Sequence, residues 1–278
     1  MKNPYIKSPL NYVGGKFKLL PEIIPLFPTS INTFVDLFGG GGNLSVNVCS
    51  ERVVYNDICE PVVELLQSLK ENSIEYSLQY IDTLVSEYQL SKENQKGYLQ
   101  LRNYYNRENK HPLVFYTMIC YAFNNQIRFN KNGDFNMPFG KDRSSFNPVL
   151  REKFITFCNR LSTLNIKFSN HSFTDLRLDK LSQTDFIYAD PPYFSSVASY
   201  NEQNGWTEVD EKNLLTLLDV ADKRGIRFAL SNNLKYDNTI LKEWLQKYKV
   251  HYLQRNYSNC NYHKIDRSKD CEVLITNY

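Results

Sequence analysis

The chain has 278 residues, of which 42% are hydrophobic and 14% aromatic. This length and composition fit one large domain, or one domain that carries an insertion. The sequence contains no apolar run near the ~20 residues needed to span a bilayer, and its first residues lack the apolar core of a signal peptide. We therefore expect a cytoplasmic protein with no membrane partner.

Cysteines and histidines do not form the patterns of a disulfide framework or a metal site. No two cysteines form a CxxC pair, and the four histidines form no HExxH motif. We expect reduced thiols that lie mostly in the core, and no bound metal. The six cysteines are Cys49, Cys59, Cys120, Cys158, Cys260 and Cys271.

Charge is distributed unevenly along the chain. The net charge is +3, but residues 92–167 contain 13 basic and five acidic side chains, a net charge of +8. The rest of the chain therefore carries −5. A basic middle predicts a polyanionic partner on one side of the molecule. A solvated helical surface is the alternative explanation.

The first glycine-rich stretch is Gly14-Gly15-Lys16, which precedes a predicted helix over residues 17–24. Backbone amides and a cation at a helix N-terminus suit an anion such as a carboxylate. A capped surface helix would explain the same pattern.

A second glycine-rich stretch, residues 39–42, lies between a predicted buried strand (33–38) and a predicted helix (44–48). Strand, glycine-rich turn and helix open the nucleotide-binding half of a doubly wound sheet. Asp36 stands just before the turn, where a carboxylate would repel a pyrophosphate and attract an amine. This favours S-adenosylmethionine, whose methionine part carries an ammonium group, over NAD.

An acidic residue also follows the next predicted strand, residues 52–55. Asp57 lies 21 residues after Asp36. An acid about 20 residues further on, at the end of a second strand, can accept hydrogen bonds from both ribose hydroxyls. The spacing predicts a nucleotide-type ligand.

Residues 73–164 are predicted to interrupt the sheet. Apolar spacing predicts helices over 61–70, 76–88, 92–107 and 112–123. We interpret 73–164 as an insertion between the two parts of a catalytic domain, residues 1–72 and 165–278.

Within the insertion, residues 127–137 are predicted to form a β-hairpin with an Asn132-Gly133 turn. Asn and Gln can pair with adenine, and Arg with guanine, in a major groove. The hairpin is therefore a candidate DNA reader, with a solvated hairpin as the alternative. The side chains in question are Asn124, Asn125, Gln126, Arg128, Lys141 and Arg143.

Strands are predicted to resume over 166–169 and 186–189, with Phe173 placed between them to pack on an adenine ring. The second strand runs into Asp190-Pro191-Pro192-Tyr193. Two prolines make this segment stiff and extended, at the strand end where α/β sheets bind ligands. A carboxylate and a free carbonyl there can hold an exocyclic amino group, and the aromatic ring can stack on its base. A plain proline-rich turn is the alternative.

The remaining sequence completes an α/β pattern. It predicts a polar loop over 195–205 that contains Tyr200 and is followed by Trp206, then helices over 208–224 and 238–248. Strands are predicted over 226–230, 250–255 and 271–276.

Three stretches, in order, resemble the Dam-type (phage Dam-like, D12 class) DNA adenine-N6 methyltransferases: residues 11–16, 36–42 and 190–193. Residues 125–130, 133–135 and 138–141 are similar to the recognition hairpin of the phage enzymes, and the resemblance covers about residues 8–277. It implies a Rossmann-like methyltransferase sheet with an inserted, mostly helical target-recognition domain that contains a β-hairpin.

The resemblance also implies S-adenosylmethionine as cofactor and double-stranded DNA as partner. Asp190, Pro191, Pro192 and Tyr193 would be catalytic and hold the target adenine. Cofactor contacts would come from Tyr12, Lys16, Asp36, Phe38, Gly40, Asp57, Ile58, Phe173 and Asp190. DNA contacts would come from Asn124, Asn125, Gln126, Arg128, Lys141 and Arg143. Family members mostly act on GATC, but Asn124, Gln126 and Asp142 differ from the phage enzymes, which leaves the recognised site open.

Other functions are compatible with parts of this pattern. An amino-methyltransferase for RNA or for a protein amide could use the same Pro-Pro-Tyr chemistry, and a DNA-binding relative could lack activity. An NAD oxidoreductase is disfavoured by the glycine spacing and by the lack of a suitably placed histidine. We expect a monomer or weak dimer.

Overall fold

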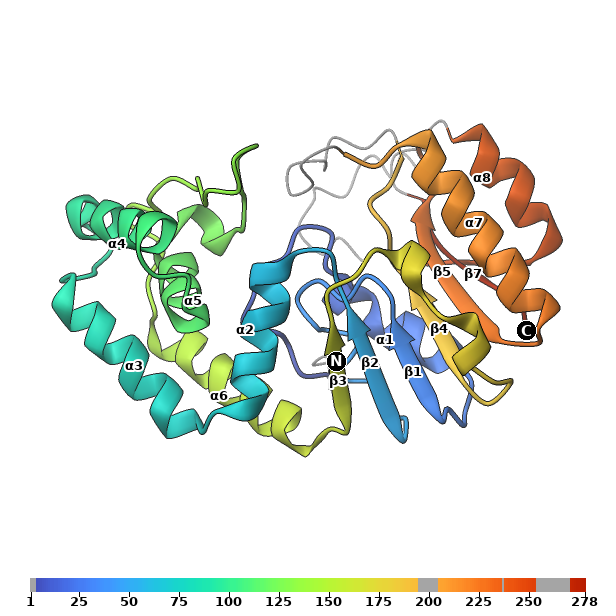
Figure 1. Ribbon diagram of the computed structural model, residues 1–278, viewed down its shortest axis with the longest axis horizontal. Coiled ribbons are helices and arrows are strands. Elements are labelled where there is room, and N and C mark those ends of the chain that lie inside the picture. Colours follow the sequence, from blue (N-terminus) through green and yellow to red (C-terminus); the bar gives the residue numbers. More distant parts are fainter. Residues whose placement is uncertain (1–3, 195–204, 237, 254–270) are drawn as a thin grey trace, which may run out of the picture.

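The computed structural model describes residues 4–194, 205–236, 238–253 and 271–278. Within these ranges, seven strands form one sheet in the order β3-β2-β1-β4-β5-β7-β6 (Figure 1). Strands β1 to β5 run parallel, and β7 runs antiparallel to both β5 and β6. The strands are β1 (Thr33–Asp36), β2 (Arg52–Asn56), β3 (Ile166–Ser169), β4 (Phe186–Ala189), β5 (Arg227–Asn233), β6 (Lys249–Tyr252) and β7 (Glu272–Thr276). The chain is thus a mixed α/β protein.

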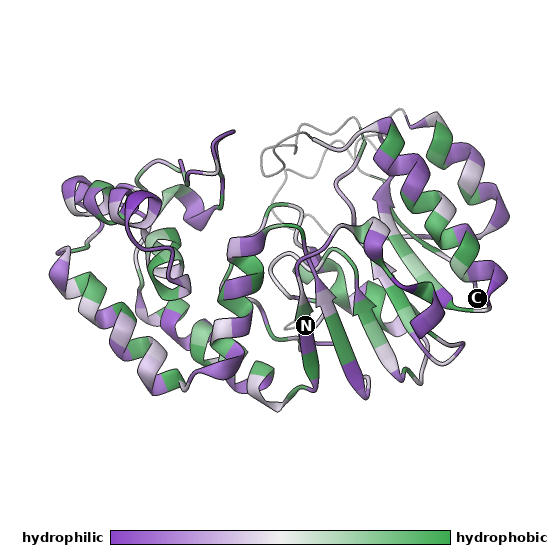
Figure 2. Ribbon diagram, viewed as in Figure 1, coloured by the Kyte–Doolittle hydropathy of each residue, from purple (hydrophilic) through white to green (hydrophobic). Residues whose placement is uncertain are grey.

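Helices cover both faces of the central strands, which explains why these strands are buried throughout. Every residue of β1 and β4 is buried, as expected for parallel strands packed on two sides. Helices α7 (Glu208–Lys223) and α8 (Thr239–Trp244) pack on one face. On the other face lie α1 (Leu20–Ile23) and the 3-10 turns Lys16–Leu19 and Ile24–Leu26. Figure 2 shows the resulting hydrophobic middle of the sheet.

The segment between β2 and β3 is helical. It contains α2 (Glu60–Glu71), α3 (Ile74–Glu87), α4 (Gln95–Arg107), α5 (Pro112–Tyr121) and α6 (Pro148–Thr163). We call α3 to α6 the helical body; it lies beside the sheet in Figure 1. Helix α5 is buried from Leu113 to Tyr121 and forms its centre. The same apolar cluster includes α2 and Tyr55 of β2, so the helical body and the sheet share packing. The division into residues 1–72, 73–164 and 165–278 stays a prediction.

The predicted strands agree with the structure to within a few residues at each end, but one long helix was missed. Helix α6 begins with Asn147, whose side-chain oxygen accepts the N–H of Leu150, and with Pro148 in its first turn. Its buried face includes Phe154, Phe157 and Leu161. A capping Asn, a first-turn proline and this spacing are the ordinary signals of a helix start and an amphipathic helix.

The predicted helix over 44–48 is wrong. These residues form a run of turns in which the N–H of Val48 bonds to the carbonyl of Leu44 at 3.0 Å. The Asn47 side chain donates to the carbonyls of Ile6 and Asn43 (2.8 and 2.7 Å). It therefore links the segment to the irregular segment around Ile6. A segment this short gains few helical hydrogen bonds of its own, and here the Asn47 side chain holds its backbone in turns.

The predicted β-hairpin over 127–137 is an antiparallel loop with one isolated bridge, Phe129 to Phe135, rather than two strands. Side chains within the loop take backbone groups that a ladder would otherwise pair. The N–H of Asp134 bonds to the side-chain oxygen of Asn130, and the carbonyl of Asn136 accepts the side chain of Arg128, both at 2.9 Å. The Asn106 side chain of α4 accepts the N–H of Phe135 and donates to its carbonyl (2.9 and 3.0 Å), which braces the loop against that helix.

Several other predictions need adjustment. The predicted helix over 238–248 is α8 followed by a 3-10 turn, Leu245–Lys247. Of the five cysteines in the described ranges, only Cys120 and Cys158 are buried, so the expected core placement is wrong for the others. The predicted loop over 195–204, including Tyr200, and the end of the predicted strand over 250–255 lie outside the described residues. None of the helices in the described ranges is long and apolar enough to cross a bilayer.

Asp185 ties the start of β4 to β1. Its buried carboxylate accepts the N–H groups of Thr33 and Ser182, both at 2.8 Å, and the side-chain amide of Asn32 at 2.9 Å. Burial alone would raise the pKa of Asp185, but the bonds from Ser182, Thr33 and Asn32 hold the pKa below its usual value. The ionised carboxylate therefore stabilises the fold.

We expect Asp185→Asn to lower the free energy of unfolding by about 1–3 kcal/mol near neutral pH, because an amide N–H would face a backbone N–H. A carboxyl group with a lowered folded-state pKa contributes stability above its unfolded-state pKa, and this contribution is lost as pH falls through the folded-state value. Urea unfolding of both proteins near neutral pH and in the acid range checks this. The gap between them should shrink in acid; a constant gap would contradict the role of the ionised form.

Candidate functional site

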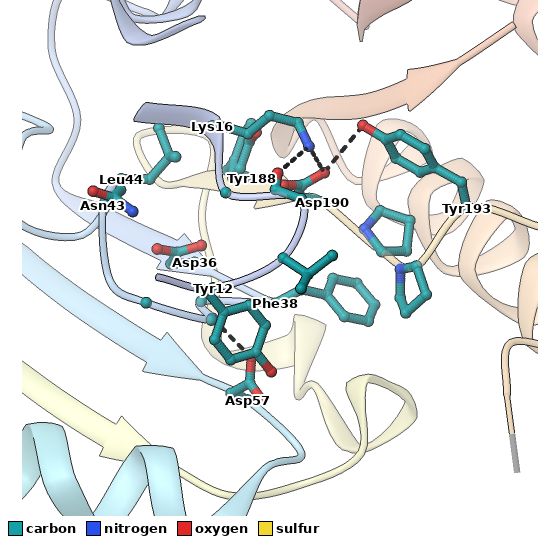
Figure 3. Close-up of a pocket in the computed structure, with 18 of the residues that line it drawn as sticks. Tyr12, Lys16, Asp36, Phe38, Asn43, Leu44, Asp57, Tyr188, Asp190 and Tyr193 are labelled. Carbon is teal, nitrogen blue, oxygen red and sulfur yellow. Dashed lines mark hydrogen bonds and ion pairs between the residues drawn. The ribbon is translucent and has the colours of Figure 1, made fainter. Parts of the chain in front are cut away.

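A cavity of about 270 Å³ opens at the carboxyl edge of the sheet, around the ends of β1 and β4 (Figure 3). The strand order reverses between these two strands, and α/β sheets bind ligands at such a reversal. Every predicted cofactor and catalytic residue except Phe173 lines this cavity. They are Tyr12, Lys16, Asp36, Phe38, Gly40, Asp57, Ile58, Asp190, Pro191, Pro192 and Tyr193.

The glycine turn after β1 forms part of the cavity wall. A side chain at Gly39 would place its first carbon 2.1 Å from the Tyr55 ring, so the ring and the turn can pack only with glycine there. The Tyr55 hydroxyl donates to the carbonyl of Gly40 at 2.6 Å. Gly40 has a positive φ of 48°, which glycine adopts without strain. The turn is thus fixed against β2 and exposes its backbone to the cavity.

Asp57 is held by backbone donors on both sides. Its carboxylate accepts the N–H of Gly40 at 2.7 Å and the N–H of Cys59 at 2.8 Å. Burial raises the pKa of Asp57, and these two bonds lower it in part. A carboxylate has about four acceptor positions, so Asp57 can accept further hydrogen bonds from a ligand. The neighbouring Ile58 side chain is 61% exposed and lines the same wall.

Asp36 is buried at the end of β1, and its carboxylate accepts the Ser45 hydroxyl at 2.6 Å. Burial, together with repulsion from Asp190 and Asp57, raises the pKa of Asp36 to about 7, despite the opposing bond from Ser45. The group therefore changes charge near neutral pH. A cationic ligand group beside it would favour the ionised form.

Lys16 makes a buried ion pair with Asp190. The ammonium lies 2.7 Å from Asp190 Oδ1 and donates to the carbonyl of Gly14 at 3.0 Å. Lys16 is only 4% exposed. Burial raises the pKa of Asp190, and the Lys16 charge opposes that rise. The sequence predicted that the turn before Lys16 suits a carboxylate, and in the structure that carboxylate belongs to the protein itself.

Glu272 and Asn233 are among the cavity residues that were not predicted from the sequence. The Tyr193 hydroxyl donates to Glu272 Oε2 at 2.9 Å, and the Asn233 side chain donates to Glu272 Oε1 at 3.2 Å. Both residues line the cavity. An acid at the first position of the apolar strand 272–276 was a usable signal, because a buried carboxylate without a partner is costly.

Phe173 lies behind the cavity wall rather than in it. Its ring centroid is 5.5 Å from that of Phe38 and 5.4 Å from that of Trp206. Trp206 also packs edge-on against Phe38 at 5.7 Å and donates its indole N–H to Glu211 at 2.6 Å. This aromatic cluster supports Phe38, the ring that faces the cavity.

The side chains predicted to contact DNA fall into two groups. Asn124, Lys141 and Arg143 are exposed, and Gln126 is half-buried. An Arg143 nitrogen lies 3.3 Å from Asn124 Oδ1, and its guanidinium lies 5.1 Å from the centre of the Phe123 ring. These residues present amide and cationic groups on the outside of residues 123–143, the segment between α5 and α6, which we call the loop from here on.

Asn125 and Arg128 are instead engaged within the loop. The Asn125 side chain donates to the carbonyl of Cys120 at 2.8 Å, at the end of α5. Arg128 donates to the side chain and the carbonyl of Asn136 at 2.8 and 2.9 Å. Both side chains hold the loop in shape, so their hydrogen-bonding groups are largely used.

One bond links this loop to the cavity. The Asn11 side chain donates to the carbonyl of Asn124 at 2.7 Å, and Asn11 directly precedes the cavity residue Tyr12. In Figure 1 the loop and the carboxyl ends of the parallel strands face the same side of the molecule. A ligand large enough to touch both would lie across that side.

Comparisons with known proteins identify a family for the chain. Residues 12–259 match the sequence profile of the D12 class N6 adenine-specific DNA methyltransferases. The chain is 46% identical to the type II methyltransferase M.FokI of Planomicrobium okeanokoites and 39% identical to the modification methylase StsI of Streptococcus sanguinis. Both alignments cover 99% of this chain but only 43% of the relative. The DNA adenine methylase of Escherichia coli K12 is 25% identical over 87% of this chain and 85% of its own length.

The profile match extends over most of the chain and includes the cavity residues from Tyr12 to Tyr193. The chain spans less than half the length of the two type II relatives. The alignment therefore does not show that this chain has the complete activities of those proteins. The family assignment does not depend on that difference. The chain belongs to the D12 class N6 adenine-specific DNA methyltransferase family.

Proposed function

We propose that this chain transfers a methyl group from S-adenosylmethionine to N6 of an adenine in a short site of double-stranded DNA. One observation carries the proposal: Asp190-Pro191-Pro192-Tyr193 lies at the end of β4 in the same cavity as Asp36 and Asp57. A pair of acids suited to a cationic nucleoside thus lies beside a segment suited to an exocyclic amine.

The cavity fits S-adenosylmethionine by the chemistry of its walls. Asp57 would accept the ribose hydroxyls, since two backbone N–H groups already orient its carboxylate. Asp36 would attract the ammonium of the methionine part, and the glycine turn leaves room for close approach. Tyr12, Phe38 and Ile58 would pack against the apolar parts. When bound, S-adenosylmethionine supplies a methyl group on a positively charged sulfur.

The catalytic segment would hold the target adenine. N6 is base-paired inside a duplex, so the adenine must leave the stack, at a cost of a few kcal/mol. Stacking on Tyr193 would offset about 1–3 kcal/mol of that cost. The Asp190 carboxylate and a carbonyl of the Pro191 region would accept hydrogen bonds from the two N6 hydrogens. These bonds would turn the nitrogen lone pair out of conjugation with the ring, so that it is free to react. Asp190 would also stabilise positive charge that develops on N6.

The helical body and its loop would place the DNA. Residues 92–167, which include α4 to α6, carry the net charge of +8, and such a charge favours a phosphate backbone. Asn124, Gln126, Lys141 and Arg143 are the outward groups for reading bases or phosphates. Amide and guanidinium side chains on a loop favour duplex DNA over a protein amide as substrate.

Transfer of labelled methyl from S-adenosylmethionine to unmethylated genomic DNA, followed by mapping of N6-methyladenine, tests the proposal. Methyl groups on adenine in one short motif are expected, and the map identifies the site as GATC or another sequence. RNA and protein substrates run in parallel. Label in RNA or protein but not in DNA would contradict the proposal, as would binding of S-adenosylmethionine without transfer to DNA.

Asp190→Ala should reduce methyl transfer by at least about 10²–10³-fold, the loss typical when a charge-stabilising group is removed. Binding of S-adenosylmethionine, measured by calorimetry, should be largely retained, because Asp57 and the glycine turn are unchanged. Asp57→Ala is the matched reverse case and should lose cofactor binding first. Because Asp190→Ala leaves the buried Lys16 without its ion-pair partner, a thermal melt checks that the variant remains folded. Normal turnover in Asp190→Ala would remove Asp190 from catalysis.

Cofactor affinity should depend on the ionisation of Asp36. Because the pKa of Asp36 is about 7, the carboxyl is neutral in acid and must ionise to pair with a ligand ammonium. Binding should therefore tighten as pH rises toward 7, by up to about tenfold per unit, and then level off. Asp36→Asn should flatten this dependence. Ser45→Ala should move its midpoint upward, since the Ser45 bond favours the ionised form. An unchanged profile in both variants would exclude Asp36 as the titrating group.

A further inference from the structure

We propose that Glu272 is a positioning residue for methyl transfer: it fixes the position of the Tyr193 ring on which the target base would stack. The inference rests on the proposed function of the cavity. Glu272 is the first residue of β7 and is 3% exposed. Its carboxylate accepts the Tyr193 hydroxyl at 2.9 Å. Glu272 lies on a different strand from the Asp-Pro-Pro-Tyr segment, 79 residues after Tyr193.

The anchor is rigid because it is part of the sheet. Glu272 and Asn233 are direct partners in the antiparallel pairing of β5 with β7. The Asn233 side chain donates to Glu272 Oε1 at 3.2 Å, while its own oxygen accepts the N–H groups of Lys235 and Cys271 (3.0 and 3.3 Å). Since both ends of the Asn233 amide are engaged, the Glu272 carboxylate has a fixed orientation.

Tyr193 needs such an anchor. The ring follows two prolines, which fix the backbone up to Pro192 but leave the two side-chain torsions of Tyr193 free. The Lys16 ammonium lies 5.0 Å and the Tyr236 ring 6.3 Å away, measured to the centre of the Tyr193 ring. The bond from the phenol to Glu272, at 2.9 Å, is a much shorter polar contact and holds the far end of the ring.

Glu272 also adds negative charge beside the catalytic carboxylate. The Tyr193 hydroxyl lies 3.5 Å from Asp190 Oδ1 as well as 2.9 Å from Glu272, so one phenol stands between two acids. Repulsion from Glu272 adds to burial in raising the pKa of Asp190. A second buried negative charge near N6 would favour positive charge on that nitrogen. Two substitutions separate these contributions. Glu272→Ala removes both the hydrogen-bond acceptor and the charge, whereas Glu272→Gln removes the charge and keeps an acceptor.

Single-turnover methyl transfer to duplex DNA tests the inference in the full chain. Glu272→Ala and Tyr193→Phe should each slow transfer by about 10- to 100-fold, the scale of effect expected from a misplaced reacting group. The double variant should be no slower than the slower single variant, because both changes break one bond. Glu272→Gln, which keeps an acceptor, should be faster than Glu272→Ala.

Cofactor affinity separates positioning from general damage. Binding of S-adenosylmethionine by calorimetry should stay within about twofold of the wild type in the Glu272 variants, whereas loss of the fold would abolish it together with transfer. Glu243→Gln is the matched control, since Glu243 is exposed on α8 and does not line the cavity. It should transfer methyl at the wild-type rate.

Three results would each overturn the inference. The first is a wild-type rate of methyl transfer in Glu272→Ala, and the second is a double variant whose loss of rate is the product of the two single losses. The third is an equal loss of rate in Glu272→Gln and Glu272→Ala that is accompanied by weakened cofactor binding. If the wild-type chain methylates no DNA, the proposed function fails by itself. A crystal structure of Glu272→Ala then decides the anchor alone: a Tyr193 ring that stays in place overturns it, and a displaced ring supports it.

Discussion

The site depends on three carboxylates that line one cavity at the edge of the sheet. Asp36, Asp57 and Asp190 follow or end neighbouring parallel strands, so the topology brings like charges together. Each charge is compensated differently: Asp57 by backbone N–H groups, Asp190 by Lys16, and Asp36 by Ser45 and partial protonation. These arrangements offset the repulsion among the three acids, and the negative charge that remains would favour a cationic ligand.

The compensation also explains the close packing around the glycine turn. The N–H of Gly40 reaches Asp57 because the turn folds tightly over the Tyr55 ring. Tyr55 belongs to the apolar cluster of the helical body. Packing in that body and the orientation of Asp57 are therefore connected through one side chain. The Asn11 bond to Asn124 provides a second, polar connection on the outer side.

Local patterns were sufficient to predict much of this structure. The apolar strands, the glycine turn, the spaced acids and the Asp-Pro-Pro-Tyr segment each leave a sequence signal, and all but Phe173 of the expected cavity residues line one cavity. Contacts between distant residues were missed. Asn106 of α4 braces the loop over 127–137, and the Tyr193–Glu272 bond joins residues 79 positions apart. Periodicity cannot reveal contacts of that kind, whereas the missed helix α6 did carry ordinary signals.

The division of labour in the loop has a consequence for how such proteins diversify. Asn125 and Arg128 hold the loop's shape through bonds to Cys120 and Asn136. Asn124, Gln126, Lys141 and Arg143 stand outside that framework with few internal bonds. Mutations at Gln126, Lys141 and Arg143 would cost little stability, so they can accumulate while the scaffold stays constant. Asn124 has a positive φ of 54°, which Asn adopts more readily than most residues. Under the proposed function, relatives could change the sequence they read at the other three positions without first having to refold.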